Sequence, residues 1–179
     1  MASESTGFES KVARCEDEIP DLIESLASPD GLVRKQARRC LIRHGEEAVD
    51  ALVEALGDES SAMRVEAAEA LLYIASPGSA EALVAALEDK EFGVRWLAAE
   101  AIIALRCDGM VPLLKGLILR SDSLWFRQSA HHVLRDHYCE RMRSELRPVL
   151  EALSGRDAED TAPVAAGQVL RELRQATRS

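Results

Sequence analysis

The chain has 179 residues, enough for one domain or one small array of repeats with a continuous core. Hydrophobic residues make up 47% of it but aromatic residues only 4%, which favours helical layers filled with alanine and leucine over a β-sandwich. The formal net charge of −9 argues against a dedicated nucleic-acid binder. No apolar run approaches the roughly 20 residues that a membrane helix needs, so we expect no membrane span.

The cysteines and the first residues of the chain bear on its cellular compartment. The four cysteines lie at positions 15, 40, 107 and 139, without CxxC spacing and without the framework that small secreted domains use. The opening MASESTGFESK lacks the basic and then apolar order of a secretory signal. We therefore expect reduced thiols and a cytoplasmic protein.

Two consecutive segments, residues 48–78 and 79–109, repeat one another. The matching positions include Leu52 with Leu83, Leu56 with Leu87, Asp58 with Asp89, Arg64 with Arg95, and Ala67 with Ala98. A fixed period of about thirty residues is the signature of a repeat architecture.

Each segment predicts two short helices. In the first segment, Val49, Leu52, Val53 and Leu56 recur at the three- and four-residue spacing of one apolar helical face. A polar stretch then separates this face from a second one that begins at Met63. Because no such pair of helices buries its apolar face alone, neighbouring pairs must cover it.

The same register extends in both directions along the chain. The predicted repeats span residues 19–47, 48–78, 79–109, 110–144 and 146–176, the last being a degenerate copy in which Pro163 replaces the arginine. Residues 1–18 form a polar N-terminal segment with a possible capping helix, and residues 177–179 form a tail. The prediction is an all-α fold, a single α-solenoid domain over residues 19–176.

Proline-led starts and aspartate–arginine pairs recur along the chain. The starts are Pro20-Asp21-Leu22, Pro112-Leu113-Leu114 and Pro148-Val149-Leu150, and the pairs are Asp58 with Arg64 and Asp89 with Arg95. In these residues the chain resembles the HEAT-repeat proteins. The chain is similar in particular to the short, phycobilisome-lyase type of repeat. The resemblance implies a superhelix of about five HEAT-like hairpins, and it says little about function.

The resemblance also implies a structural ladder. In such families the arginine opens the second helix of the repeat and contacts the inter-helix aspartate, forming rungs along the stack. Arg34 and Arg127 take the arginine position in repeats one and four. There, Ser28 and Ser121 replace the aspartate, so we expect weaker rungs.

The second helices of a solenoid line its concave side, where such proteins usually bind. Helical spacing places a set of candidate partner-binding residues on that side: Trp96, Val65, Leu72, Ile103, Arg38, Arg39, His131, His132 and Arg135. The middle of this face is apolar around Trp96, with more basic flanks, as in an interaction site with a polar rim. The competing interpretation is that these side chains pack between repeats, and the exposure of Trp96 separates the two.

The best candidates for metal ligands are His131, His132, His137 and Cys139, because zinc binds histidine and cysteine side chains. Adjacent histidines on a helix point about 100° apart, so His131 and His132 cannot readily chelate one ion together. We predict no metal site, and the absence of GxSxG, P-loop, GxGxxG and HExxH motifs leaves no catalytic residue or cofactor to propose.

The preferred function is therefore a non-enzymatic protein-interaction module: an adaptor, scaffold or regulatory subunit, itself a monomer, whose partner is another protein. One alternative is a chromophore lyase or chaperone similar to the phycobilin lyases. Another is a HEAT-like nucleic-acid-binding protein, which would need a basic concave face. Glu69 and Glu100 interrupt that face, so nucleic acid is an unlikely partner.

Overall fold

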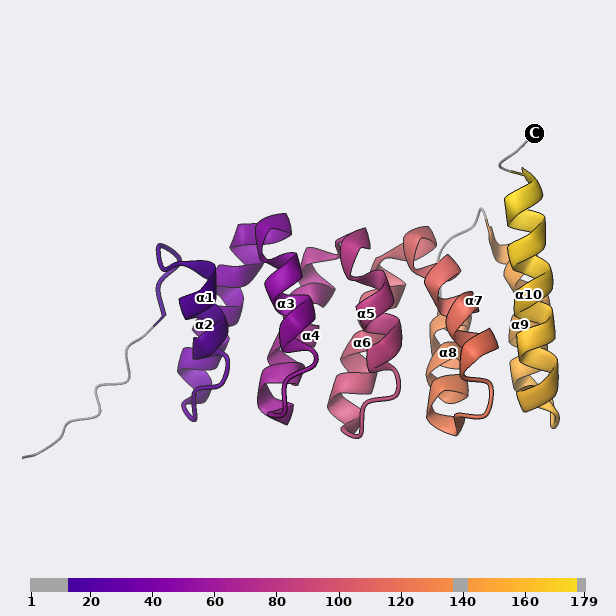
Figure 1. Ribbon diagram of the computed structural model, residues 1–179, viewed down its shortest axis with the longest axis horizontal. Coiled ribbons are helices and arrows are strands. Elements are labelled where there is room, and N and C mark those ends of the chain that lie inside the picture. Colours follow the sequence, from indigo (N-terminus) through magenta and orange to yellow (C-terminus); the bar gives the residue numbers. More distant parts are fainter. Residues whose placement is uncertain (1–12, 137–141, 177–179) are drawn as a thin grey trace, which may run out of the picture.

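The computed structural model describes residues 13–136 and 142–176, which form helices joined by turns and contain no strand. The helices are α1 (Ile19–Ser25), α2 (Gly31–His44), α3 (Val49–Ala55), α4 (Ser61–Ile74), α5 (Ala80–Ala86), α6 (Phe92–Ala104), α7 (Met110–Leu119), α8 (Leu124–Asp136), α9 (Arg143–Ser154) and α10 (Ala158–Ala176). Short 3₁₀ turns, Gly45–Ala48, Pro77–Ser79 and Arg106–Gly109, lead into α3, α5 and α7. Figure 1 shows the helical hairpins side by side in sequence order.

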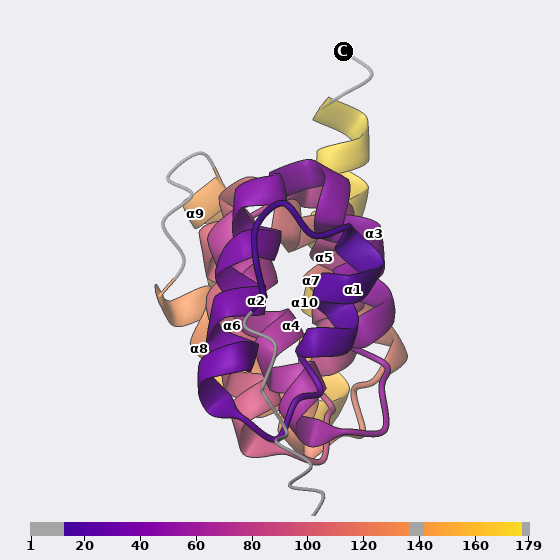
Figure 2. The same ribbon diagram turned by 90° about the vertical axis from the view of Figure 1, so that its left-hand side faces the viewer.

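The hairpins stack into two layers. In the first-helix layer, α1 packs on α3 and α5 packs on α7, and in the second-helix layer α2, α4, α6 and α8 pack in succession. Figure 2, which looks along the stack, shows the two layers side by side. The predicted all-α solenoid is confirmed.

Equivalent residues of the repeats occupy equivalent places in the core. The leucines at one position of the first helices (Leu22, Leu52, Leu83, Leu114) and the alanines at one position of the second helices (Ala37, Ala67, Ala98, Ala130) are all fully buried. Small alanines let neighbouring second helices approach closely. Within the fourth hairpin, Gly116 lets α7 lie close to α8: an added Cβ there would be 2.4 Å from the Phe126 ring.

Side-chain caps explain where several second helices begin. The Asp30 carboxylate accepts a hydrogen bond from the Leu32 N–H at 2.8 Å, and the Ser60 hydroxyl accepts one from the Met63 N–H. These contacts satisfy N–H groups that have no partner within the helix. α2 ends at Gly45, whose φ of +61° suits glycine.

The C-terminal hairpin reverses the order of the layers. A fifth copy in the common register would place its first helix beside α7. Instead α9 packs on α8, and α10 packs on both α7 and α9 (Figure 1). The apolar stripe of α9, formed by Leu146, Val149 and Leu153, therefore extends the second-helix layer.

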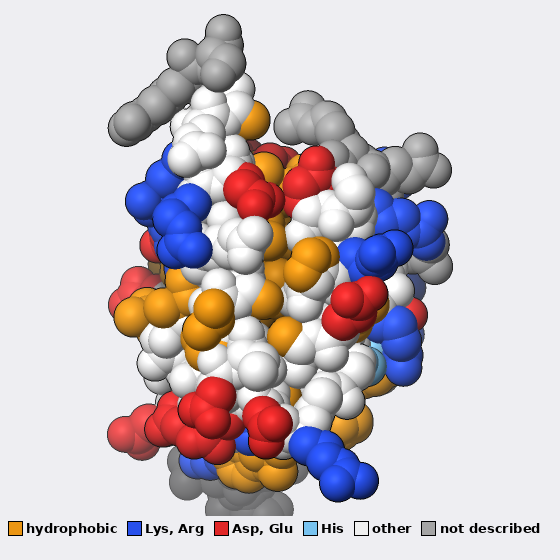
Figure 3. Space-filling model, turned by 90° about the vertical axis from the view of Figure 1, so that its right-hand side faces the viewer, with side chains coloured by type: hydrophobic (Ala, Val, Ile, Leu, Met, Phe, Trp, Pro, Cys, Tyr) orange, Lys and Arg blue, Asp and Glu red, His pale blue; other side chains and the backbone are white. Residues whose placement is uncertain are grey.

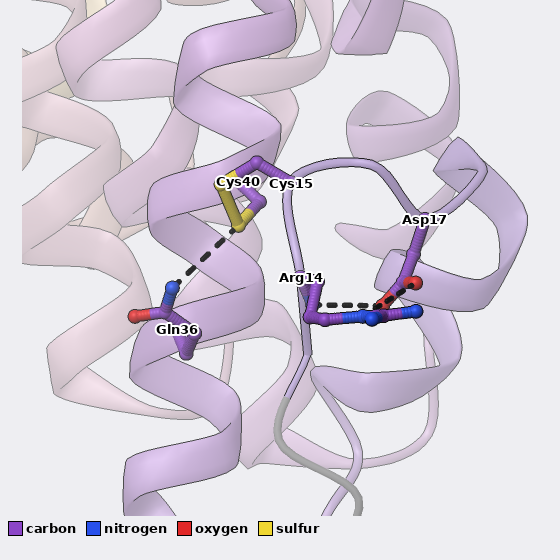
Figure 4. Close-up of a disulfide and its surroundings, with 5 residues drawn as sticks. All are labelled: Arg14, Cys15, Asp17, Gln36 and Cys40. Carbon is purple, nitrogen blue, oxygen red and sulfur yellow. Dashed lines mark hydrogen bonds and ion pairs between the residues drawn. A yellow bond between two sulfur atoms is a disulfide. The ribbon is translucent and has the colours of Figure 1, made fainter.

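The expectation of reduced thiols is wrong. Cys15 and Cys40 form a disulfide, with their Cα atoms 4.6 Å apart, and Cys107 is also disulfide-bonded. Cys139 lies outside the described residues. Figure 4 shows the first bond tying the segment before α1 to the middle of α2. Local spacing could not reveal this pair, because 25 positions separate the two cysteines and the chain must fold back to join them.

The disulfides also remove the basis for a cytoplasmic assignment, because such bonds persist mainly in oxidising compartments. Within the same segment, residues 13–18 form a turn rather than the possible capping helix. The Asp17 carboxylate accepts from the Arg14 N–H at 2.7 Å in that turn. No helix in the described parts of the chain has the length and apolar character to cross a bilayer.

Candidate functional site

Four arginines occupy one position in the first turn of the second helices, and they share one contact. Arg64 Nη1 donates to the carbonyl oxygens of Asp58 at 2.8 Å and Glu59 at 3.0 Å, in the loop that precedes its own helix. The equivalent bonds run from Arg34 to Ser28, from Arg95 to Asp89 and from Arg127 to Ser121. Each arginine therefore closes its own hairpin through backbone carbonyls.

The contact with an aspartate carboxylate runs between repeats rather than within one. Arg64 Nε and Nη2 donate to the two oxygens of Asp89, in the next repeat, at 2.7 and 3.0 Å. The Asp58 carboxylate, which the family pattern pairs with Arg64, instead accepts from the Ser60 N–H. Burial alone would raise the pKa of Asp89, but hydrogen bonds from Arg64 and from the Glu91 backbone, with the charge of Arg64, lower it.

The other arginines find different second partners. Arg34 Nε lies 3.3 Å from a carboxylate oxygen of Glu66. Arg95 faces a loop with Ser121 in place of the aspartate, and its guanidinium lies over the Trp125 ring, 4.6 Å from the centroid. Arg127 lies 3.9 Å from Glu159. We expected weaker rungs in repeats one and four, where Ser28 and Ser121 replace the aspartate. Because the carboxylate contact runs to the next repeat, Ser121 instead leaves Arg95 without a carboxylate, and Arg34 pairs with Glu66 although the next loop keeps Asp58.

A partly exposed group of aromatic and cationic side chains lies on α6 and α8, and we call it the Trp96 cluster: Phe92, Arg95, Trp96, Trp125 and His132. The Trp96 ring stacks on His132 with centroids 4.8 Å apart and lies 6.2 Å from Phe92. Trp96 and Trp125 are each 47% exposed, and Phe92 is 68% exposed. Trp96 therefore packs on the next repeat with part of its surface and leaves about half of its surface exposed to solvent.

The cluster includes two aromatic residues that the sequence analysis missed. Phe92 and Trp125 lie in the first turn of their helices, and neither is among the candidate partner-binding residues that helical spacing gave. Phe92 precedes Trp96 by four residues, and that spacing could have placed the two rings on one face. Trp125 belongs to the next repeat, and only the stacking of α6 on α8 brings it to Arg95.

His132 connects the cluster to two acidic residues. Its Nε2 lies 2.9 Å from a Glu100 oxygen and its Nδ1 lies 3.1 Å from an Asp136 oxygen. Arg135 donates to both oxygens of Asp136, and this hydrogen bonding lowers the pKa of Asp136. The ring of His132, which supports Trp96, is thereby held from both edges.

The remaining predicted residues differ in their availability. Arg38 is mostly buried and pairs with Glu66 and with Glu69, the latter at 2.9 Å, so its charge is used between repeats. Arg39 is exposed. Val65, Leu72 and Ile103 are half-buried, and His131 lies 3.1 Å from the Ser154 hydroxyl. Glu69 and Glu100, expected to interrupt a basic face, are both paired with cationic or imidazole side chains.

A cavity of about 580 Å³ opens between α8 and α9, and we call it the arginine pocket. Its lining includes Leu134, Arg135, Arg143, Leu146, Arg147 and Leu150. Figure 3 looks at the C-terminal end of the stack, where basic side chains gather on both flanks and hydrophobic side chains lie between them.

The described residues hold no group of three or more His, Cys, Asp or Glu side chains that could bind a metal ion. His137 and Cys139 lie outside them. Cys15, Cys40 and Cys107 are in disulfides, so none of the three offers the free thiol that a lyase role could use.

Comparison with known proteins identifies the family. No curated protein matches the chain significantly. The family model for HEAT repeats matches residues 19–103 and again residues 64–135, which together span more than half of the chain. This match does not distinguish the phycobilisome-lyase type, so that subtype stays a prediction. With its stacked hairpins and the arginine at one position of four second helices, the chain belongs to the HEAT-repeat family.

Proposed function

We propose that this HEAT-repeat chain is a protein-interaction module, an adaptor, scaffold or regulatory subunit, that binds a partner protein on its second-helix layer. The observation that carries the proposal is the Trp96 cluster. The chain has two tryptophans, and both lie half-exposed in this cluster. Leaving such large apolar surfaces in water is unfavourable, and a partner that covers them recovers that free energy.

The chemistry of the cluster suits an anchor for a partner. Tryptophan and arginine are the side chains that most often dominate binding energy at protein interfaces. Arg95 is fixed between its loop carbonyls and the Trp125 ring, and Trp96 rests on a histidine that two carboxylates hold. Because these side chains are already ordered, this chain would lose little side-chain conformational entropy when a partner binds them.

The first test is the substitution Trp96→Ala, compared with Leu119→Ala as a control. Leu119 is 77% exposed but lies on α7, in the first-helix layer, away from the cluster. Both variants and the wild type would be used to capture partners from native lysate, with the bound proteins compared by mass spectrometry. Trp96→Ala should abolish capture of a partner that Leu119→Ala retains, with a loss of roughly 2 kcal/mol or more in binding.

Thermal unfolding of the same three proteins decides what a loss of capture means. Trp96 is half-exposed, so its removal should leave helicity and melting nearly unchanged. A collapse of stability in Trp96→Ala would show that the residue is structural. Unaltered capture by a stable Trp96→Ala protein would show that partners bind elsewhere.

A further inference from the structure

The arginine pocket combines an apolar floor with a basic rim. Leu134 and Leu146 are buried, Leu150 is half-buried, and all three line the cavity between α8 and α9. Arg135, Arg143 and Arg147 line the same cavity, and all three are exposed. A floor of this kind accepts an aliphatic or aromatic side chain, and guanidinium groups bind carboxylates through paired hydrogen bonds.

The positive charge of the pocket is only partly compensated. Asp136 holds Arg135 through two hydrogen bonds. Arg147 pairs with Glu151 at 3.2 Å, but both side chains are more than two-thirds exposed, so solvent screens this pair and it is weak. Arg143 makes no ion pair with any described residue. Arg143 is therefore available to bind a carboxylate of a partner, and Arg147 becomes available when its weak ion pair with Glu151 opens.

The pocket continues the surface of the Trp96 cluster. Arg135, which lines the pocket, has its Nη2 atom 3.4 Å from Nδ1 of His132. The His132 ring in turn stacks on Trp96, so His132 joins the pocket to the cluster. α9 belongs to the same layer as α6 and α8, because the C-terminal hairpin reverses the order of its helices. A partner segment lying across the cluster therefore reaches the pocket without leaving the second-helix layer.

We propose that the arginine pocket receives an acidic segment of the partner protein, with carboxylates on Arg143 and Arg147 and a neighbouring apolar side chain on the leucine floor. This inference rests on the proposed function, since it assigns the chemistry of the partner at one end of the same surface. Continuity with the Trp96 cluster favours a protein segment over a free anionic lipid. Its charge complements the rim, and its apolar side chain fills the floor.

The test uses the full-length, oxidised chain and a library of random twelve-residue peptides displayed on phage. Peptides are selected separately on the wild type, on Arg143→Glu/Arg147→Glu, on Trp96→Ala and on the control Arg43→Glu. Arg43 is an exposed arginine of α2, far along the stack from the pocket. Arg143 is the first residue of α9, where a glutamate is favourable for the helix, so the double variant should fold, and circular dichroism checks this.

Wild type and Arg43→Glu should both enrich peptides with Asp or Glu beside a large apolar residue. Synthetic copies of these peptides should bind Arg143→Glu/Arg147→Glu at least about a hundredfold more weakly, since two charge-assisted contacts, each worth about tenfold in Kd, are lost. Binding of these copies should also weaken as salt rises.

Each contrary result has a distinct meaning. Enriched peptides that need Trp96 but contain no acidic residue, or that bind the double variant equally well, overturn this inference and leave the proposed function standing. Acidic peptides that need Arg143 and Arg147 but are indifferent to Trp96→Ala support the pocket and refute the Trp96 anchor. No enrichment on the folded wild type overturns both. If dodecanoate binds more tightly than the best peptide and displaces it, the occupant is a lipid-like anion and the peptide assignment is overturned.

Discussion

The bond between Arg64 and Asp89 is the contact whose removal should cost the stack most. Arg64 is 5% exposed and donates four hydrogen bonds, two to carbonyls of its own loop and two to the carboxylate of the next repeat. The substitution Arg64→Ala would leave Asp89 charged, largely buried and held only by the Glu91 N–H. It would also leave the carbonyls of Asp58 and Glu59 without these donors.

The magnitude follows from that geometry. Breaking a buried ion pair by removing one partner costs about 3–5 kcal/mol. Because Asp89 keeps its backbone hydrogen bond, we expect a loss near the lower limit, about 3 kcal/mol. For a chain of this size that lowers Tm by about 6–12 °C. Arg95→Ala removes equivalent carbonyl contacts and two cation–π contacts, to Phe92 and Trp125, but leaves no buried carboxylate, so about 1–2 kcal/mol is expected.

The assay is urea unfolding followed by circular dichroism, on the wild type, Arg64→Ala, Arg95→Ala, Asp89→Asn and the double variant Arg64→Ala/Asp89→Asn. The double variant should lose less free energy of unfolding than the sum of the losses in the two single variants. The reason is that, once Asp89 is replaced by Asn, Arg64→Ala no longer leaves a buried carboxylate without its ion-pair partner. If Arg64→Ala costs no more than Arg95→Ala, or if the two losses simply add, the carboxylate contact between repeats does not stabilise the stack.

Three further outcomes are expected. Because its partners lower the pKa of Asp89, its stabilising effect is fully present above the unfolded value, near about 4, and is lost as pH falls through the folded value. The stability difference between wild type and Asp89→Asn should therefore shrink on acidification, and a difference that stayed constant down to about pH 2 would contradict the pairing. Native protein without reductant should show no reactive thiol at Cys15 or Cys40, and Cys15→Ser/Cys40→Ser should lose up to about 3.5 kcal/mol for a closed loop of 25 residues. Ready labelling of either thiol would refute the bond. Gly116→Ala should destabilise by about 1–3 kcal/mol through its clash with the packed ring of α8, whereas Gly167→Ala, with contacts no closer than 3.7 Å, should stabilise slightly, and equal effects in calorimetry would refute the close approach.

The residues predicted to bind a partner differ in how available the structure leaves them, and their role stays a prediction. Trp96 and His132 lie where helical spacing places them, and the structure brings them into direct stacking. Arg38 was expected at the rim, but Glu66 and Glu69 of the next repeat use its charge. The sequence reveals that an arginine and a glutamate share one side of the array. It does not reveal whether the glutamate is close enough to neutralise the arginine.

Local patterns in the sequence predict much of the fold. The period of the repeat, the two apolar faces of each hairpin and the arginine at the start of each second helix can all be read from residues 19–135. The physical reason is that a helix exposes the same face every three or four residues, and each hairpin must be covered by a neighbour of the same kind.

Only the tertiary structure decided which repeats supply the partners of each side chain. The carboxylate that holds Arg64 comes from the next loop, Cys15 finds Cys40 by folding back, and α9 rather than α10 extends the second-helix layer. These outcomes depend on how far one hairpin is shifted and rotated against the next. That displacement is set by the packing of many side chains at once, and the residues of a single repeat do not encode it.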